Sequence, residues 1–196
     1  MDLQIAASVI GFAPAGEGAE SVRFDGHSAY VCTAEVVTLT DPVYFFDLSD
    51  LANITYQDTG VIAGFSTSLI NLGDGYLLGI GVGDSRSTLK IEVYRESENG
   101  VVSVCSYEAK STGYATDYKS YFIDRERGLL GLGILEYNKS MAEGSYYLLL
   151  HFNGSKLNVV LKEHLMGGNE DKRGVLIDGY FYMFGENGFL VRSISE

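Results

Sequence analysis

Short apolar runs separated by polar turns recur along the whole chain. Each unit begins with an apolar strand, passes through a tight turn that carries Asp or Gly, and returns as a second apolar strand. The four turns contain Asp25, Asp74, Asp124 and Asp178, so successive units are 49, 50 and 54 residues apart. Asp-Gly between alternating apolar stretches is a strong hairpin signal. The pattern therefore predicts four β-hairpins, and no helix is clearly indicated.

Further strands are predicted after each hairpin. A third apolar segment occurs in every unit, and a fourth occurs in the first three. Repeats of ~40–50 residues with four antiparallel strands are typical of β-propeller blades. We therefore predict an all-β fold and one β-propeller domain over residues 1–196, with four-stranded antiparallel blades at approximately residues 20–60, 67–110, 118–163 and 173–196. Residues 109–117 and 162–172 are predicted to be loops between successive blades.

The last unit ends without a fourth strand, whereas residues 3–10 form a strand candidate that belongs to no unit. An unpaired edge and a spare strand can satisfy each other by pairing. We therefore expect residues 3–10 to complete the fourth blade and close the ring. One alternative is a half-ring completed by a second copy, which would make the protein a homodimer. The other is a β-sandwich, which also has regularly spaced strands.

Composition supports a folded β-protein and excludes some partners. Hydrophobic residues make up 46% of the chain, and 24 glycines accompany only two prolines. The formal charge is −12 with 14 Lys and Arg along the chain, which argues against nucleic acid because phosphate binding needs clustered basic residues. The N-terminus lacks the basic segment of an export leader, and no apolar run is long enough to span a bilayer. Membrane insertion is therefore not expected.

The sequence contains no recognisable catalytic or metal-binding constellation. Residues 79–83 resemble a fragment of a nucleotide loop, but no helix follows them, so close packing of backbones is the preferred explanation for these glycines. No two of the three histidines have the spacing of zinc ligands. They are His27, His151 and His164. We therefore predict no catalytic residue, no metal and no cofactor.

Candidate binding residues lie in the predicted loops between blades. Loops on a rigid β-scaffold are a common place for recognition. Those after the second and third blades should emerge on the same face and present Tyr114, Asp117, Glu170 and Asp171. They favour a non-enzymatic binding or scaffold module for a protein or a carbohydrate. The alternative is a propeller-type carbohydrate-active hydrolase, which would need two carboxylates within roughly 5–10 Å across a central pocket.

Several segments, in order along the chain, carry a family resemblance. They are residues 21–24, 29–31, 41–50, 79–81, 122–129 and 173–177. With them the chain resembles bacterial secreted proteins that have a C-terminal β-propeller domain distantly related to WD40 repeats. The resemblance extends over roughly residues 11–195 and implies a secreted or cell-surface location, although no leader is recognised in this sequence. It implies an extracytoplasmic binding role and carries no active site.

Overall fold

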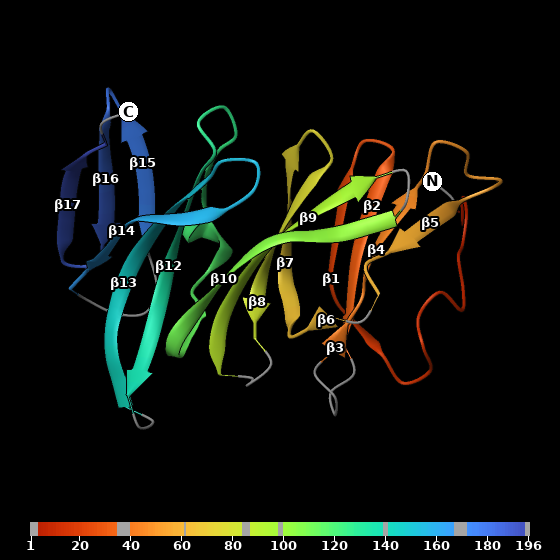
Figure 1. Cartoon of the computed structure of the whole chain (residues 1–196), viewed down its shortest axis with the longest axis horizontal. Helices are drawn as coiled ribbons and strands as arrows, with labels where there is room; N and C mark the ends of the chain where they lie inside the picture. Colours follow the sequence, from red (N-terminus) through yellow and green to blue (C-terminus); the bar gives the residue numbers. More distant parts are fainter. Residues whose placement is uncertain are drawn as a thin grey trace.

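The fold consists almost entirely of antiparallel β-strands, as the sequence predicts. The computed structural model describes residues 4–34, 40–60, 62–83, 87–97, 100–138, 141–166 and 172–194. Figure 1 shows the sheets following one another along the longest dimension of the molecule, with the N-terminus at one end and the C-terminus at the other. No helix in the described residues has the length and apolar character needed to cross a membrane.

The first sheet has four strands in the order β1-β2-β4-β5. They are β1 (Gly18–Asp25), β2 (Ser28–Ala34), β4 (Val43–Asp47) and β5 (Thr55–Asp58). A separate short ladder pairs β3 (Thr40–Asp41) with β6 (Ile62–Ala63). All three pairings in this sheet are antiparallel, and only the short β3 comes between β2 and β4 in the chain, so the sheet is a meander.

The central sheet contains most of the remaining strands, in the order β14-β13-β12-β10-β9-β8-β7. Their bounds are β7 (Phe65–Gly73), β8 (Tyr76–Val82), β9 (Thr88–Ser97), β10 (Gly100–Ala115), β12 (Leu129–Asn138), β13 (Met141–Phe152) and β14 (Leu157–His164). The short strand β11 (Phe122–Asp124) also pairs with β12, after the 3-10 turn η1 (Tyr118–Ser120). The last sheet has three strands, β15 (Arg173–Ile177), β16 (Tyr180–Gly185) and β17 (Gly188–Ser193).

Strand β10 corrects the prediction that residues 109–117 form a loop. Its first part pairs with β9, and after a shift in register between Glu108 and Thr112 its last part, Thr112–Ala115, pairs with β12. One long strand thus joins the second and third predicted units into a continuous sheet. Because β10 changes its pairing partner from β9 to β12, residues 109–115 remain within a strand, although their composition predicted a loop.

The predicted closure of the ring within one chain is also corrected. Residues 4–10 form no strand, and among the described strands β17 pairs only with β16. The N-terminal segment instead packs on the first sheet, where Val9, Phe12 and Ala13 cover Tyr44 and Phe46. Burying the aromatic ring of Phe12 holds the segment at the end of the molecule opposite β17.

Three apolar cores separate the stacked parts of the fold. One lies between the first sheet and β7–β9, one between the β7–β9 and β12–β13 parts of the central sheet, and one between β12–β13 and the last sheet. They form because neighbouring residues of a strand point to opposite faces. Leu77 packs toward the first sheet, whereas Leu78 packs toward the unit formed by β12 and β13. The same alternation turns Leu148 toward the second unit and Leu149 toward β15–β17. Fully burying one such side chain contributes roughly 1.5–3 kcal/mol, so each core stabilises the packing of the two parts that it joins.

Candidate functional site

Four hairpin turns line up along one edge of the molecule. They connect β1 to β2, β7 to β8, β11 to β12 and β15 to β16, and all four lie at the upper edge in Figure 1. In the second hairpin both central residues have positive φ, 52° at Asp74 and 75° at Gly75, which is the type I′ geometry that Asp-Gly favours. Asp178 and Gly179 repeat it with 48° and 77°. Asp74 and Asp178 are therefore turn residues, as the repeat predicts, whereas Asp25 and Asp124 are the last residues of β1 and β11 and directly precede their turns.

The third hairpin has a longer turn and different chemistry. Arg125, Glu126 and Arg127 stand between Asp124 and Gly128, whereas in the other three hairpins Gly follows Asp directly. The backbone N–H of Arg127 donates to Asp124 Oδ1 at 3.0 Å, and its guanidinium forms an ion pair with Asp124 Oδ2 at 3.0 Å. The backbone hydrogen bond, and secondarily the side chain of Arg127, hold the pKa of Asp124 below its ordinary value.

A first groove, of about 270 Å³, lies between the second and third hairpins. Arg125 spans them, since its Nε and Nη2 donate to the carbonyl of Asn71 at 3.0 and 2.7 Å. Tyr76 and Phe152 also line it and meet edge to face with ring centroids 5.1 Å apart. The guanidinium of Arg95 lies 5.0 Å from the centroid of the Tyr76 ring. The groove thus combines a charged rim with packed aromatic walls.

A second groove, of about 380 Å³, lies between the third and fourth hairpins. Apolar side chains of Leu129, Leu176 and Ile194 line it together with Asp178. Asp124 and Arg127 line both grooves, so their ion pair forms the ridge between them. A ligand bound in either groove would meet the carboxylate of Asp124 and the guanidinium of Arg127.

Comparison with known protein families agrees with this architecture. The family model described as "Beta propeller domain" matches residues 1–195. The chain belongs to the β-propeller domain family. No curated protein matches the sequence. The successive antiparallel sheets and their shared hairpin edge are accordingly parts of a propeller domain. The first groove lies between two hairpins of the central sheet, and the second lies between the central sheet and the last sheet.

Tyr114, the first of the binding residues expected from the sequence, lies away from these grooves. Its ring stacks at a tilt on Tyr137, with centroids 5.7 Å apart, and the two hydroxyl oxygens are 2.9 Å from each other. Tyr137 stands near the end of β12 that is farthest from the β11–β12 turn. The hydrogen bond to Tyr137, followed by burial, raises the pKa of Tyr114 to about 12. The pair is therefore an exposed aromatic feature of the opposite edge.

The carboxylate of Asp117 caps the 3-10 turn. Its Oδ1 accepts from the backbone N–H of Lys119 at 2.9 Å, and the ammonium of Lys119 lies 3.9 Å from its other oxygen. Glu170 and Asp171 lie outside the described residues. Lys172 is buried against Gly133 together with Thr116, so this residue comes close to the segment that contains Tyr114 and Asp117. Lys172 and Thr116 thus lie close together, and neither lines the two grooves.

Arg125 and Arg127 are the groove residues that sequence reasoning did not select. The signal was present in the repeat, because the third hairpin replaces Asp-Gly by a five-residue turn with two arginines. Reading all four Asp residues as equivalent turn formers concealed this difference. An insertion of charged residues at one turn of a repeated structure is the feature that would have indicated the groove edge.

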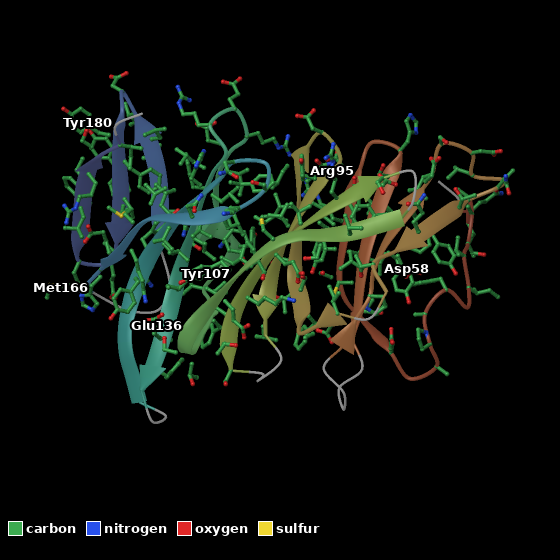
Figure 2. The ribbon with its side chains drawn as sticks, in the orientation of Figure 1. Asp58, Arg95, Tyr107, Glu136, Met166 and Tyr180 are labelled. Carbon is green, nitrogen blue, oxygen red and sulfur yellow. The ribbon has the colours of Figure 1, made fainter. Side chains whose placement is uncertain are left out.

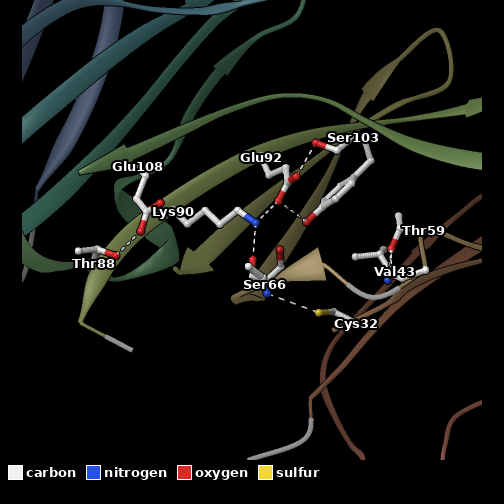
Figure 3. A network of polar contacts seen from close by, with 12 residues as sticks. Cys32, Val43, Thr59, Ser66, Thr88, Lys90, Glu92, Ser103 and Glu108 are labelled. Atoms are coloured by element: carbon white, nitrogen blue, oxygen red, sulfur yellow. Dashed lines mark hydrogen bonds and ion pairs between the residues drawn. The ribbon is translucent and has the colours of Figure 1, made fainter. Parts of the chain in front are cut away.

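A buried polar network between the first sheet and β9 has catalytic residue types but a structural arrangement (Figure 3). Glu92 accepts hydrogen bonds from Ser103 at 2.5 Å and Tyr94 at 3.3 Å, and forms an ion pair with Lys90. Lys90 also donates to the carbonyl of Ala63. Burial raises the pKa of Tyr94 well above its ordinary value. None of these side chains lines either groove, so the network satisfies buried groups where two sheets pack.

Glu136 is the other buried carboxylate, and Figure 2 labels it on β12. Lys162 donates to both of its carboxylate oxygens at 2.7 Å, and the same ammonium lies 4.7 Å from the centroid of the Tyr146 ring. A carboxylate held in this way is already compensated. Among the described residues, no group of three His, Cys, Asp or Glu side chains is arranged to hold a metal ion.

Proposed function

We propose that this propeller domain is a non-enzymatic binding module that captures a partner protein along its hairpin edge. The observation that carries the proposal is the ridge formed by Asp124 and Arg127, which serves two adjoining grooves. Side chains at the tips of short hairpins are held by the sheets below them, so little ordering is needed when a partner binds.

The chemistry of the rim favours a protein segment over a carbohydrate. Asp74, Asp124 and Glu126 place negative charges beside the guanidinium groups of Arg125 and Arg127. Both signs within one groove suit a peptide with its own basic and acidic side chains, because complementary charges fix register and orientation. The aromatic rings of Tyr76 and Phe152 pack on each other. Their packing makes them walls of the groove and not platforms for stacking a sugar ring.

The finer features of the family assignment belong to the same proposal. We take the stacked sheets as propeller blades, four per chain, and place the module outside the cell among secreted or surface-attached proteins distantly related to WD40 repeats. The support for location is the resemblance of segments such as residues 41–50 and 173–177. A binding module outside the cell needs an accessible surface for its partner and does not need the enclosed pocket of an enzyme.

The experiment is a selection of peptides from a random display library on the immobilised domain, with a glycan array as a parallel arm. We expect peptides that carry charges of both signs to be enriched, and expect their binding to fall about tenfold or more in Arg127→Gln, since a hydrogen bond to a charged group is worth roughly 1.5–3 kcal/mol. Lys119→Gln is the control: this exposed lysine of η1 lines neither groove, and its variant should bind normally.

Two outcomes would overturn the proposal. Peptides that bind Arg127→Gln and the unaltered domain equally well would show that the ridge is not the recognition site. Binding of glycans alone, with no peptide enriched, would replace the protein partner by a carbohydrate.

A further inference from the structure

The last blade has one apolar face that nothing in the described structure covers. Phe181 and Met183 of β16 are buried against the third blade, whereas the alternate residues of β16 point the other way. Register places Val175 and Ile177 of β15 and Phe189 of β17 on that second face. We call the apolar part of this side the tail face; its residues are Val175, Ile177, Tyr180, Tyr182, Phe184 and Phe189. The same register also places Arg173, Val191 and Ser193 on this side.

The tail face is built like the faces that pack between blades inside the chain. Each of the three internal cores uses alternate apolar residues of two adjacent strands or more. On the tail face, Phe184 and Phe189 stack with ring centroids 5.6 Å apart, yet Phe189 is 61% exposed. Figure 2 shows Tyr180 at the end of the molecule that carries β15–β17. The face therefore has the composition of a blade interface and lacks its second blade.

The opposite end of the molecule has a complementary face on the first blade. Val22 pairs across the sheet with Val31, which pairs with Tyr44, and Phe24 is related in the same way to Phe46. These residues share one side of the sheet, which we call the head face: Val22, Phe24, Ala29, Val31, Tyr44 and Phe46. It points away from the core that the first blade shares with β7–β9, because Tyr30 and Phe45 face that core.

Only part of the head face is covered. Phe12 packs edge to face on Tyr44 and Phe46, with centroids 5.0 and 5.1 Å apart, and reaches Tyr56 of the outer strand β5 at 6.4 Å. On the inner strand β1, Val22 and Phe24 stay 52% and 68% exposed. Within the described residues, one extended segment thus covers the outer strands of the head face and leaves more than half of the Val22 and Phe24 side chains of β1 exposed.

The head face and the tail face together would supply the parts of one complete interface between blades. A neighbouring blade has four strands, and the last blade of this chain has three, with β17 unpaired on its outer side among the described strands. The N-terminal segment lies over the outer part of the head face, where a preceding blade would place its fourth strand. Because the head and tail faces lie at opposite ends of the longest dimension, they do not meet within one chain.

We propose that two copies of this chain join head to tail, with the tail face of each packed on the head face of the other. Two identical contacts then close a two-fold ring with no apolar face left open. Residues 4–10 of one copy run beside β17 of the other and add the missing fourth strand to its last blade. Doubling four blades gives eight, within the range of about 4–8 known for propellers.

The first test is the mass of the full chain by light scattering over a range of concentrations. One chain has a mass of 21.4 kDa, and we expect twice that value at high concentration. A mass that stays at 21.4 kDa at every concentration would overturn the proposal. A mass that grows without limit would indicate head-to-tail fibres and would overturn the closed ring.

Charged substitutions then test the two faces separately. Phe24→Asp on the head face and Phe189→Asp on the tail face should each give monomers, since either one places a carboxylate in both interfaces of the ring. Both side chains are largely exposed in one copy, so the monomer should keep its fold, checked by circular dichroism. Tyr118→Asp is the matched control: this residue is 69% exposed on η1, outside both faces, and its variant should remain a dimer.

Mixing the two variants distinguishes head-to-tail pairing from other arrangements. A Phe24→Asp copy has an intact tail face and a Phe189→Asp copy has an intact head face, so together they should form a heterodimer through one undamaged interface. Native mass spectrometry of differently tagged variants would detect it. If Phe24→Asp alone remains a dimer and the mixture forms no heterodimer, the tail faces pair with each other and the proposal is overturned.

A last variant tests the added strand. Ile5→Pro removes a backbone donor from the N-terminal segment and should weaken the dimer about three- to tenfold, the effect of one lost hydrogen bond or so. Ile5→Ala keeps the donor and should leave the dissociation constant closer to the original. Equal dissociation constants for the two variants would overturn the strand exchange, while the pairing of faces is decided by the preceding experiments.

Discussion

Lys162 reaches across from β14 and lies 2.7 Å from both carboxylate oxygens of Glu136. The carboxylate is buried, whereas the lysine keeps about a third of its side chain exposed. The ion pair therefore has one partner that water can still screen and one that it cannot. Losing the lysine should cost more than losing an ordinary surface charge, because Glu136 would remain buried without compensation.

We accordingly expect Lys162→Met to lower the free energy of unfolding by roughly 1–3 kcal/mol, less than the full penalty of a buried pair because of the partial exposure. Urea denaturation at neutral pH measures it. Adding Glu136→Gln to Lys162→Met should recover part of the loss, since the unpaired charge is removed. A double variant less stable than Lys162→Met would show that Glu136 is not left uncompensated in the single variant.

Gly81 allows two backbones to approach where β7 and β8 pair. A Cβ atom on Gly81 would overlap the carbonyl of Phe65 and lie 2.8 Å from the Cα of Ser66. Gly81→Ala should therefore destabilise the fold by roughly 1–3 kcal/mol, because backbone atoms would have to shift. Gly18→Ala is the control, with no heavy atom within 4 Å of the added carbon, and its thermal midpoint should stay unchanged. Equal midpoints for both variants would contradict the close approach.

Local chemistry explains what the sequence could predict. Asp74-Gly75 and Asp178-Gly179 form their turns through conformations that these residue pairs adopt readily, so four hairpins could be expected without any tertiary information. Alternation of apolar residues predicted strands on both sides of each turn. The attribution of residues 79–83 to close backbone packing is confirmed at Gly81, whereas an added carbon at Gly79 or Gly83 would meet side chains.

The missed features depend on contacts between distant segments. The extension of β10 to Ala115 arises because its last residues pair with β12, about twenty residues further along, and nothing in residues 109–115 themselves signals that partner. The position of the N-terminal segment was wrong for a similar reason. Pairing with β17 would have given the last unit its fourth strand. In the structure, Phe12 packs instead on Tyr44 and Phe46 at the other end of the molecule.

The tyrosine pair at the opposite edge gives a prediction in alkaline solution. The pKa of Tyr114 is raised to about 12, chiefly by its hydrogen bond with Tyr137. A pKa raised in the folded state means that this contribution to stability is complete below the unfolded value near 10 and is lost as the pH rises toward 12. Tyr137→Phe should lower the pKa of Tyr114 toward 10, observed by the absorbance of tyrosinate. An unchanged titration would mean that burial, and not the hydrogen bond, dominates.

Asp124 gives the opposite dependence in acid. Its pKa lies below the ordinary value of 3.8, first because the backbone N–H of Arg127 donates to it. A lowered pKa in the folded state contributes stability that is complete above the unfolded value and is lost as the pH falls through the folded one. NMR titration of the carboxyl group should therefore give a midpoint below 3.8. In Arg127→Gln the midpoint should rise only part of the way, because the backbone donor remains; a full return to 3.8 would assign the effect to the guanidinium alone.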